Sequence, residues 1–251
     1  MLWAALGLNR PAVVACVGAG GKTSLIQSLA AGACRRGWPV LVTATTKMFY
    51  SQVAGYELVL TEAAATGVAQ VAAALQQGQP VGWFARLEGE KVIGVPAGGI
   101  DSIAAKAPWA NILIEADGAR QALLKAPSAR EPVIPACTSV TVGIVNLGAV
   151  GQPLTAANTH RPELVSGIIG KQAGAAVAWS DIVRLAVHRQ GLFQYARGTR
   201  VLLLSGAQDP DLRPAGRLIA GDKTLAGAGL ARVVLTTGYG CNMQPCEVYL
   251  L

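Results

Sequence analysis

Short apolar runs alternate with longer amphipathic stretches along most of the chain. Strands are predicted at residues 12–17, 40–43, 57–60, 112–115, 140–145, 201–204 and 233–236, and helices at 22–35, 61–77, 162–169, 180–190 and about 214–226. Several strand runs are apolar at nearly every position, which is typical of strands buried on both faces. The pattern predicts an α/β fold, a doubly wound, mostly parallel sheet with helices on both faces.

One stretch, residues 81–96, interrupts this alternation. Two apolar arms, 81–85 and 91–95, flank a polar turn that contains Gly89. This pattern predicts a small β-hairpin insert that packs at the sheet edge or projects as a flap. Neither an internal repeat nor a low-complexity linker divides the chain, so we expect a single domain over residues 1–251.

A glycine-rich turn joins the first predicted strand to the first long helix. It reads Gly18-Ala19-Gly20-Gly21-Lys22-Thr23-Ser24. Glycines let backbone N–H groups converge on anionic oxygens, and the helix N-terminus favours negative charge there. The turn therefore predicts a phosphate-binding loop, with Lys22 at the β/γ-phosphates and the Thr23 hydroxyl on Mg²⁺. We therefore expect the single domain to be a P-loop-type nucleotide-binding domain.

The match to the phosphate-loop pattern is incomplete. The full pattern has a glycine five residues before Gly21, and Cys16 stands there. A plain glycine turn with a surface lysine is the alternative interpretation. A dinucleotide-binding loop fits less well, because Ser24 occupies the position of its third glycine.

Two further strand ends carry candidate chemistry. The predicted strand 112–115 ends at Glu115, and Asp117 follows two residues later, so the two carboxylates share a face of an extended strand. One carboxylate could hold Mg²⁺ while the other orients a nucleophile. The second strand ends in Thr45, Thr46 and Lys47, which could sense the γ-phosphate. The alternatives are an ordinary strand end with an Asp-Gly turn and a β-branched strand end with a solvated lysine.

Basic residues follow the acidic strand. Arg120, Lys125 and Arg130 could clamp a second anionic substrate, and so could His160 and Arg161 beside a predicted helix start. A solvated loop and a structural histidine are the alternatives. After the strand at 201–204, only Asp209 fits a guanine-reading pattern, so guanine specificity is not supported and adenine is not excluded.

Composition narrows the class of protein. The net charge is +7, from 21 basic and 14 acidic residues spread along the chain, without the aromatic-interleaved basic patch typical of nucleic-acid binding. Five scattered cysteines and two histidines make a structural zinc site unexpected. The chain contains no uncharged apolar run of about 18 residues, so a membrane span is not expected. Since no signal-peptide pattern is visible either, we expect a cytoplasmic protein.

Together these motifs resemble the YqeC family. The segments that carry the resemblance are 18–23, 43–48, Glu115-Ala116-Asp117-Gly118-Ala119, Lys125-Ala126-Pro127, 131–135 and His160-Arg161-Pro162-Glu163. The resemblance implies a phosphate-loop nucleotide-binding protein that acts as an accessory factor in the maturation of selenium-dependent molybdenum hydroxylases. Its implied partners are the molybdenum cofactor or the hydroxylase apoprotein.

Three hypotheses follow for the function. The first is a Mg²⁺-dependent nucleoside triphosphatase, using ATP or GTP, with Lys22, Glu115, Asp117 and Lys47 as candidate catalytic side chains. The second is a kinase or nucleotidyl-transfer enzyme that holds a phosphorylated cofactor with Arg120, Lys125 and Arg161. The third is a non-catalytic, nucleotide-gated carrier or chaperone.

Overall fold

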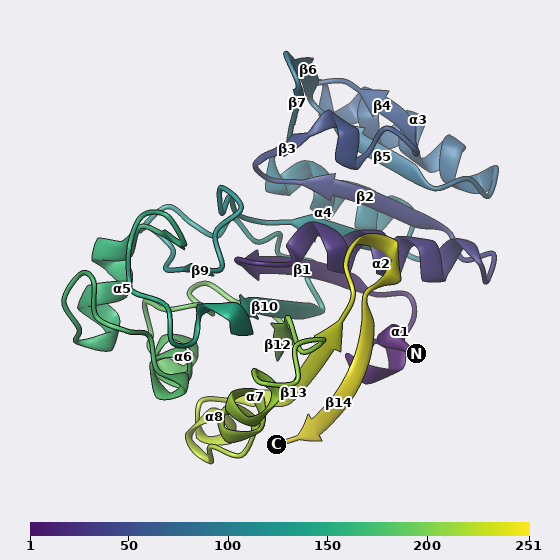
Figure 1. Cartoon of the computed structure of the whole chain (residues 1–251). Coiled ribbons are helices and arrows are strands. Elements are labelled where there is room, and N and C mark those ends of the chain that lie inside the picture. The colour runs from purple at the N-terminus through teal and green to yellow at the C-terminus, as the bar shows by residue number, and fades with distance from the viewer.

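A nine-stranded sheet runs through the molecule. The computed structural model describes residues 1–251. The strand order is β14-β13-β12-β10-β1-β8-β2-β5-β4, and every neighbouring pair is parallel except β13 and β14 (Figure 1). The strands are β1 (Val13–Gly18), β2 (Val40–Ala44), β4 (Glu57–Leu60), β5 (Val81–Phe84), β8 (Asn111–Glu115), β10 (Val140–Asn146), β12 (Thr199–Ser205), β13 (Leu230–Thr237) and β14 (Gln244–Leu250).

Helices cover both faces of this sheet. They are α1 (Leu2–Ala5), α2 (Lys22–Cys34), α3 (Ala64–Gln76), α4 (Ala97–Lys106), α5 (Pro162–Ile169), α6 (Trp179–Val187), α7 (Arg213–Ala220) and α8 (Thr224–Gly227). No helix combines the length and the apolar character that crossing a bilayer requires. The predicted α/β class, with a mostly parallel sheet between two helical layers, is confirmed.

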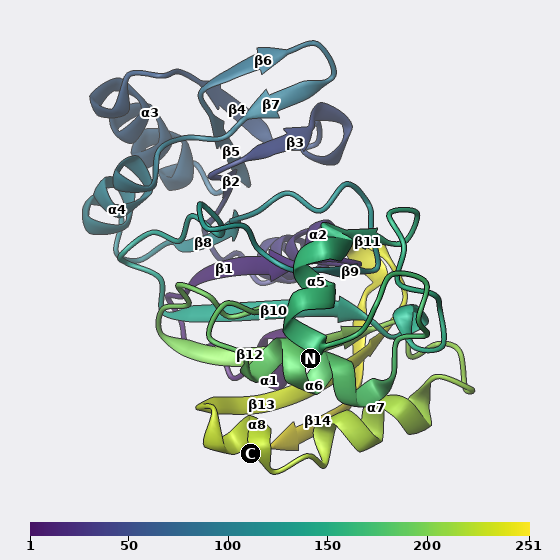
Figure 2. The same cartoon turned by 90° about the vertical axis from the view of Figure 1, so that its left-hand side faces the viewer.

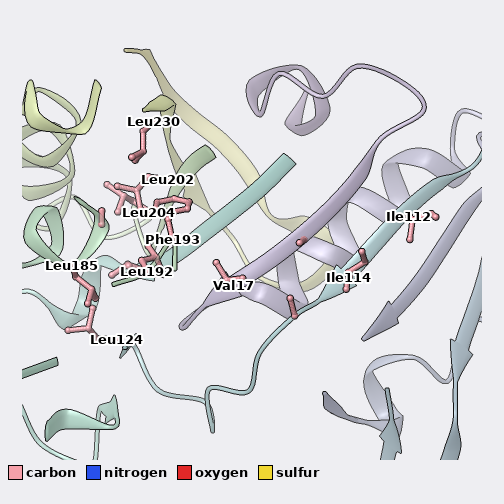
Figure 3. Packing of buried hydrophobic residues seen from close by; sticks show 14 of the residues in the cluster. Val17, Ile112, Ile114, Leu124, Leu185, Leu192, Phe193, Leu202, Leu204 and Leu230 are labelled. Carbon is pink, nitrogen blue, oxygen red and sulfur yellow. The ribbon is translucent and has the colours of Figure 1, made fainter. Parts of the chain in front are cut away.

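The alternation of side chains along β1 explains the two layers. Val14 and Cys16 pack in a core with α1 and α2, whereas Ala15 and Val17 pack in the core on the opposite face, which the other helices cover. Figure 3 shows part of this second core around Val17. Because both faces are buried, the central strands are apolar at consecutive positions, which is the pattern read from the sequence.

Two small sheets flank the main one. Strands β3 (Lys47–Phe49), β7 (Lys91–Ile93) and β6 (Arg86–Glu88) form an antiparallel sheet, and β9 (Leu124–Lys125) pairs with β11 (Thr159–His160) in parallel. In Figure 2 the three-stranded sheet lies beyond the β2 side of the main sheet. Its β6–β7 hairpin, with the turn at Gly89, lies within the predicted insert, whereas β3 comes from outside it.

The predicted first arm of that hairpin was wrong. Residues 81–84 are β5, a parallel strand between β2 and β4, and the hairpin itself is β6 and β7. Trp83 and Phe84 are fully buried in the main sheet, so the apolar character of this run reflects burial on both faces. The predicted helix at about 214–226 is also two helices, α7 and α8, and the Thr224 N–H at the start of α8 donates to Asp222 Oδ1.

Candidate functional site

The glycine loop lies at the carboxyl end of β1, in the centre of the sheet. Gly18 has φ +93° and Gly20 has φ +78°. A Cβ would lie 2.3 Å from the Ile144 carbonyl oxygen at Gly18 and 2.5 Å from the Asn146 Cβ at Gly20. Only glycine therefore fits either position, and the tight turn brings the chain directly into α2.

The loop presents unpaired N–H groups. Those of Gly20 and Gly21 donate to no carbonyl or side chain. Helix α2 begins at Lys22, so the N–H groups of its first turn have no intrahelical partner either. Converging free donors at the positive end of a helix make an anion-binding site.

The missing first glycine has a structural explanation. Cys16 is a fully buried residue inside β1, beside Glu115 of β8. Burial raises the pKa of its thiol, so the side chain remains a neutral, apolar-packed group. The turn itself starts at Gly18, and the pattern's first glycine position is part of the strand.

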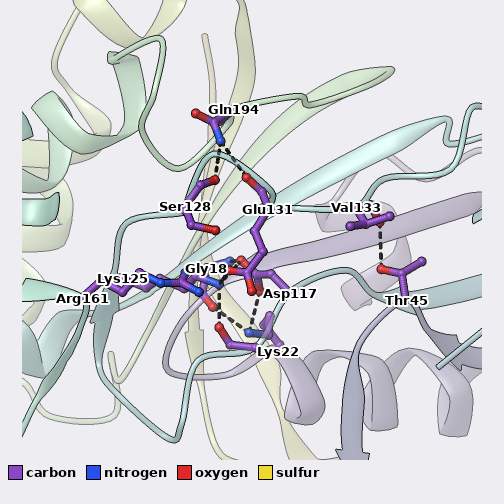
Figure 4. Close-up of polar contacts among 11 residues, drawn as sticks. Gly18, Lys22, Thr45, Asp117, Lys125, Ser128, Glu131, Val133, Arg161 and Gln194 are labelled. Atoms are coloured by element: carbon purple, nitrogen blue, oxygen red, sulfur yellow. Dashed lines mark hydrogen bonds and ion pairs between the residues drawn. The ribbon is translucent and has the colours of Figure 1, made fainter. Parts of the chain in front are cut away.

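Lys22 is held by a buried carboxylate beneath the loop (Figure 4). Its Nζ lies 2.7 Å from Asp117 Oδ1 and donates to the Gly18 carbonyl at 2.7 Å. Burial lowers the pKa of Lys22, but the charges of Asp117 and Glu115 outweigh that effect and raise it. The lysine is therefore charged, and its ammonium group lies close to the free N–H groups.

Asp117 joins the loop to a second lysine. Its Oδ2 accepts the Gly18 N–H at 3.0 Å and lies 2.9 Å from Lys125 Nζ. Asp117 is 2% exposed and does not line the cleft described below. Oδ1 thus has the ion pair with Lys22 but no hydrogen bond, and Oδ2 is bonded to Gly18 and paired with Lys125; the predicted role of Asp117 as a Mg²⁺ ligand stays a prediction.

The charged contacts continue away from the loop. Lys125 Nζ lies 2.9 Å from Glu131 Oε2, and Arg161 lies 2.6 Å from the same oxygen. Burial opposes ionisation of Glu131, but its bonds to Arg161 and Lys125 bring its pKa to about 2. We call Lys22, Asp117, Lys125, Glu131 and Arg161 the charge chain; it alternates in sign and crosses the site.

Lys125 lies deeper than the sequence suggested. It is 1% exposed and also donates to the Gly118 carbonyl at 2.5 Å. The pairing of β9 with β11 fixes this position, because it aligns Lys125 with His160. Lys125 therefore supports the site from below, and Arg161, 24% exposed, reaches its surface.

Thr23 and Glu115 form the part of the site that suits Mg²⁺. The Thr23 hydroxyl donates to Glu115 Oε2 at 3.1 Å, and both residues line the cleft. Burial raises the pKa of Glu115, although the charge of Lys22 opposes this. No cluster of three His, Cys, Asp or Glu residues surrounds a point that could hold a metal. One hydroxyl and one carboxylate fit an ion that takes its other ligands from phosphate and water, as Mg²⁺ does.

Of the three residues predicted to sense the γ-phosphate, two line the cleft and one does not. The Thr45 hydroxyl donates to the Val133 carbonyl at 2.8 Å, and the residue does not line the cleft. Thr46 and Lys47 do line it. Lys47 is exposed, and its Nζ lies 3.4 Å from Glu88 of β6, so it stands at the rim with a partner.

All these elements surround one cleft of about 790 Å³. Its lining comes from the glycine loop, the small antiparallel sheet and the segments after β8 and β9. Predicted residues that line it are Gly20, Gly21, Lys22, Thr23, Ser24, Thr46, Lys47, Glu115, Arg120, His160 and Arg161. Of the other predicted site residues, Gly18 and Ala19 lie in the loop, and Asp117 and Lys125 lie beneath it.

The sequence did not point to several residues of the site. Asn146 and Ser205, at the ends of β10 and β12, both donate to the Gly20 carbonyl, and Lys91 of β7 lines the cleft. The signal for Asn146 and Ser205 was their place directly at the end of predicted strands. Lys91 carried no such signal, since it depends on how the hairpin packs.

Comparison with known proteins identifies the relatives of this chain. A sequence model of the YqeC protein family matches residues 14–163. YqeC of Escherichia coli (strain K12) is 34% identical over 191 residues, which are 74% of this chain and 72% of that protein. Chloroplast FtsY from Physcomitrella patens, a solved structure, is similar with a TM-score of 0.45 and 17% identity. That superposition covers 96% of this chain, which spans 64% of the FtsY chain.

The family match includes the glycine loop, Glu115, Asp117 and the His160-Arg161-Pro162-Glu163 segment. It thus contains every residue of the charge chain. A match of this extent, with a relative at 34% identity over most of both chains, leaves a single conclusion: the chain belongs to the YqeC family.

Proposed function

We propose that this protein binds a Mg²⁺–nucleoside triphosphate at the glycine loop and hydrolyses it. The observation that carries this proposal is the charged, buried Lys22 beneath free N–H groups at the start of α2. Thr23 and Glu115 lie beside it with the donor types that Mg²⁺ prefers. A ligand with a single carboxylate is the alternative occupant of the loop. The negative charge of Glu115 would repel it less than a triphosphate, but it would accept hydrogen bonds from far fewer of the free N–H groups.

Each residue has a role in this proposal. Lys22 leaves Asp117 and moves to the β/γ-phosphates, where it offsets the charge that develops during transfer. Thr23 and Glu115 would hold the metal, which as a Lewis acid would polarise the phosphoryl oxygens. Glu115 also orients the attacking water. Asp117 Oδ1, released from Lys22, would then be free to accept a hydrogen bond from a water on the metal, while Oδ2 would stay with Lys125. Thr46 and Lys47, which line the cleft, would contact the γ-phosphate.

The test is a calorimetric binding panel of ATP, GTP and CTP with Mg²⁺, followed by turnover assays. We expect Lys22→Ala to weaken binding by at least about 100-fold, or ~2.7 kcal/mol. Lys106→Ala, at the exposed end of α4, is the matched control. Equal binding and turnover in the two variants would contradict the assignment of nucleotide binding to the glycine loop. Tight binding without turnover would favour the nucleotide-gated carrier.

The family suggests a pathway for this activity. We propose that the nucleotide is used in the cytoplasmic maturation of a selenium-dependent molybdenum hydroxylase, with its molybdenum cofactor or apoprotein as partner. Support comes from the resemblance alone. A pull-down with the hydroxylase apoprotein, with and without nucleotide, tests it: capture that does not depend on nucleotide state, or no capture, would contradict a nucleotide-driven role.

A further inference from the structure

One wall of the cleft, made of residues outside the glycine loop, gathers positive charge. Arg120, His160 and Arg161 line it, and Lys91 faces the same cleft from β7. Arg120 and Lys91 make no ion pair. Arg161 shares the single carboxylate of Glu131 with Lys125. The wall therefore holds more positive charges than acidic partners.

The pKa of His160 shows the same excess of positive charge. Burial and the neighbouring charges of Arg161, Lys125 and Arg120 lower its pKa, and Glu131 only partly opposes them. Three cations thus act on one imidazole from β9, from the loop after β8 and from the residue before α5. An anion bound among these side chains would stabilise the cations and the protonated histidine together.

The backbone of this wall is also held in an unfavourable conformation. Arg120 has φ +47°, Gln121 φ +61° and Arg161 φ +60°, and these are three of the four non-glycine residues with positive φ in the chain. Such residues carry an energetic cost and concentrate at ligand sites. Here they turn two arginines toward one cleft.

This wall is separate from the loop. In the charge chain, Asp117, Lys125 and Glu131 lie between Lys22 and Arg161 (Figure 4). Since the loop already supplies free N–H groups and Lys22 for a triphosphate, this wall has donors left for a different group.

We propose that Arg120, His160 and Arg161 form a second anion subsite, which binds the phosphate group of a phosphorylated small molecule facing the glycine loop. This inference deepens the proposed function, because it gives the loop's triphosphate a phosphorylated co-substrate in the same cleft. The subsite itself consists of residues outside the loop, so it can be tested apart from nucleotide binding.

The experiment uses inorganic phosphate as the probe and the full chain with Mg²⁺ and a non-hydrolysable ATP or GTP analogue at saturation. The chain has only two histidines, so NMR can follow His160 while His188, on α6's C-terminal side, serves as an internal control. We expect phosphate to raise the pKa of His160 and leave His188 unchanged. Arg120→Gln should weaken phosphate binding about tenfold, whereas Arg189→Gln, on the exposed surface, should not change it.

The outcomes separate the two proposals. Phosphate binding that the analogue displaces, that Lys22→Ala abolishes and that Arg120→Gln leaves unchanged would overturn the second subsite and keep the loop. Binding that survives Lys22→Ala but weakens in Arg120→Gln supports the subsite, even if no nucleotide binds the loop. An unchanged His160 titration over the whole phosphate range would overturn the subsite as well.

Discussion

Lys125 is the residue on which most of the site's electrostatics depend. Its ammonium group contacts both Asp117 and Glu131 and is 1% exposed. Asp117 is 2% exposed and Glu131 is 25% exposed, and each also has a second cation, Lys22 for Asp117 and Arg161 for Glu131. A neutral side chain at this position would leave each carboxylate with one charge partner and would break the contact that joins the two pairs.

We therefore expect Lys125→Met to destabilise the fold by about 1.5–3 kcal/mol, the usual loss when a hydrogen bond to a charged group is removed. Chemical denaturation measures the loss. Lys91→Met, which removes an exposed lysine without an ion pair, should change stability by less than about 0.5 kcal/mol. Equal midpoints for the two variants would show that the charge chain contributes nothing to stability.

At this scale the sequence could indicate which residues gather at the site but not how deeply they lie. Lys22, Glu115 and Thr46 follow ends of predicted strands, and parallel strand ends share an edge, so their approach was predictable. The burial of Lys125 was not, because it follows from the pairing of β9 with β11, whose residues are 35 positions apart in the chain. The contact of Asp117 Oδ2 with Lys125 depends on that same pairing.

At the scale of elements, the fit of α3 and α4 onto β5 depends on two glycines. The Trp83 indole lies between the helices; a Cβ at Gly67 would be 2.4 Å from its ring and one at Gly99 would be 3.1 Å away. The ring is 1% exposed. These contacts explain why residues 81–84 form a strand of the main sheet instead of a hairpin arm: the run carries a large ring that needs cover from two helices.

Gly67→Ala should destabilise the protein, because the cost of overpacking against Trp83, about 1–3 kcal/mol, exceeds the helix propensity gained, about 1 kcal/mol. Gly167→Ala in α5, where a Cβ would meet nothing within 4 Å, should stabilise it by about 0.5–1 kcal/mol. Thermal unfolding of both variants tests this difference in sign. Two stabilised variants would mean that the Trp83 ring moves aside freely.

The remaining elements show where local pattern suffices. Predicted strands that are apolar throughout were confirmed, since burial on both faces leaves a strong local signal. Strand β14 was missed because its residues alternate between exposed and half-buried at the sheet edge, and its place beside β13 is decided by contacts across the turn 238–243. The single-domain assignment over 1–251 stays a prediction.

At the scale of the whole molecule, the charge chain connects the two walls of the cleft. Under the proposed function, a triphosphate at the loop would draw Lys22 from Asp117 and leave that carboxylate to Lys125. Lys125 would then share less of its charge with Glu131, so Glu131 would bind Arg161 more strongly. Binding at one wall would thereby change the electrostatics of the other.

We expect the nucleotide analogue to change the affinity for phosphate at the Arg120–Arg161 wall, within the range of about 5- to 150-fold typical of coupled sites. Phosphate must then change the affinity for the analogue by the same factor. Calorimetric titrations in both orders measure the two factors. A factor of one in either order would contradict coupling through the chain.

The position of Glu131 between Lys125 and Arg161 has a consequence for how tightly nucleotide hydrolysis would be tied to binding of the co-substrate. If the loop lysine and the arginine of the second subsite respond to two ligands through this one series of contacts, each ligand alone would rearrange part of the series, and both together would rearrange all of it. Hydrolysis of the nucleotide without the phosphorylated co-substrate would then be slow, because Arg161 would reach its final orientation only with both ligands bound.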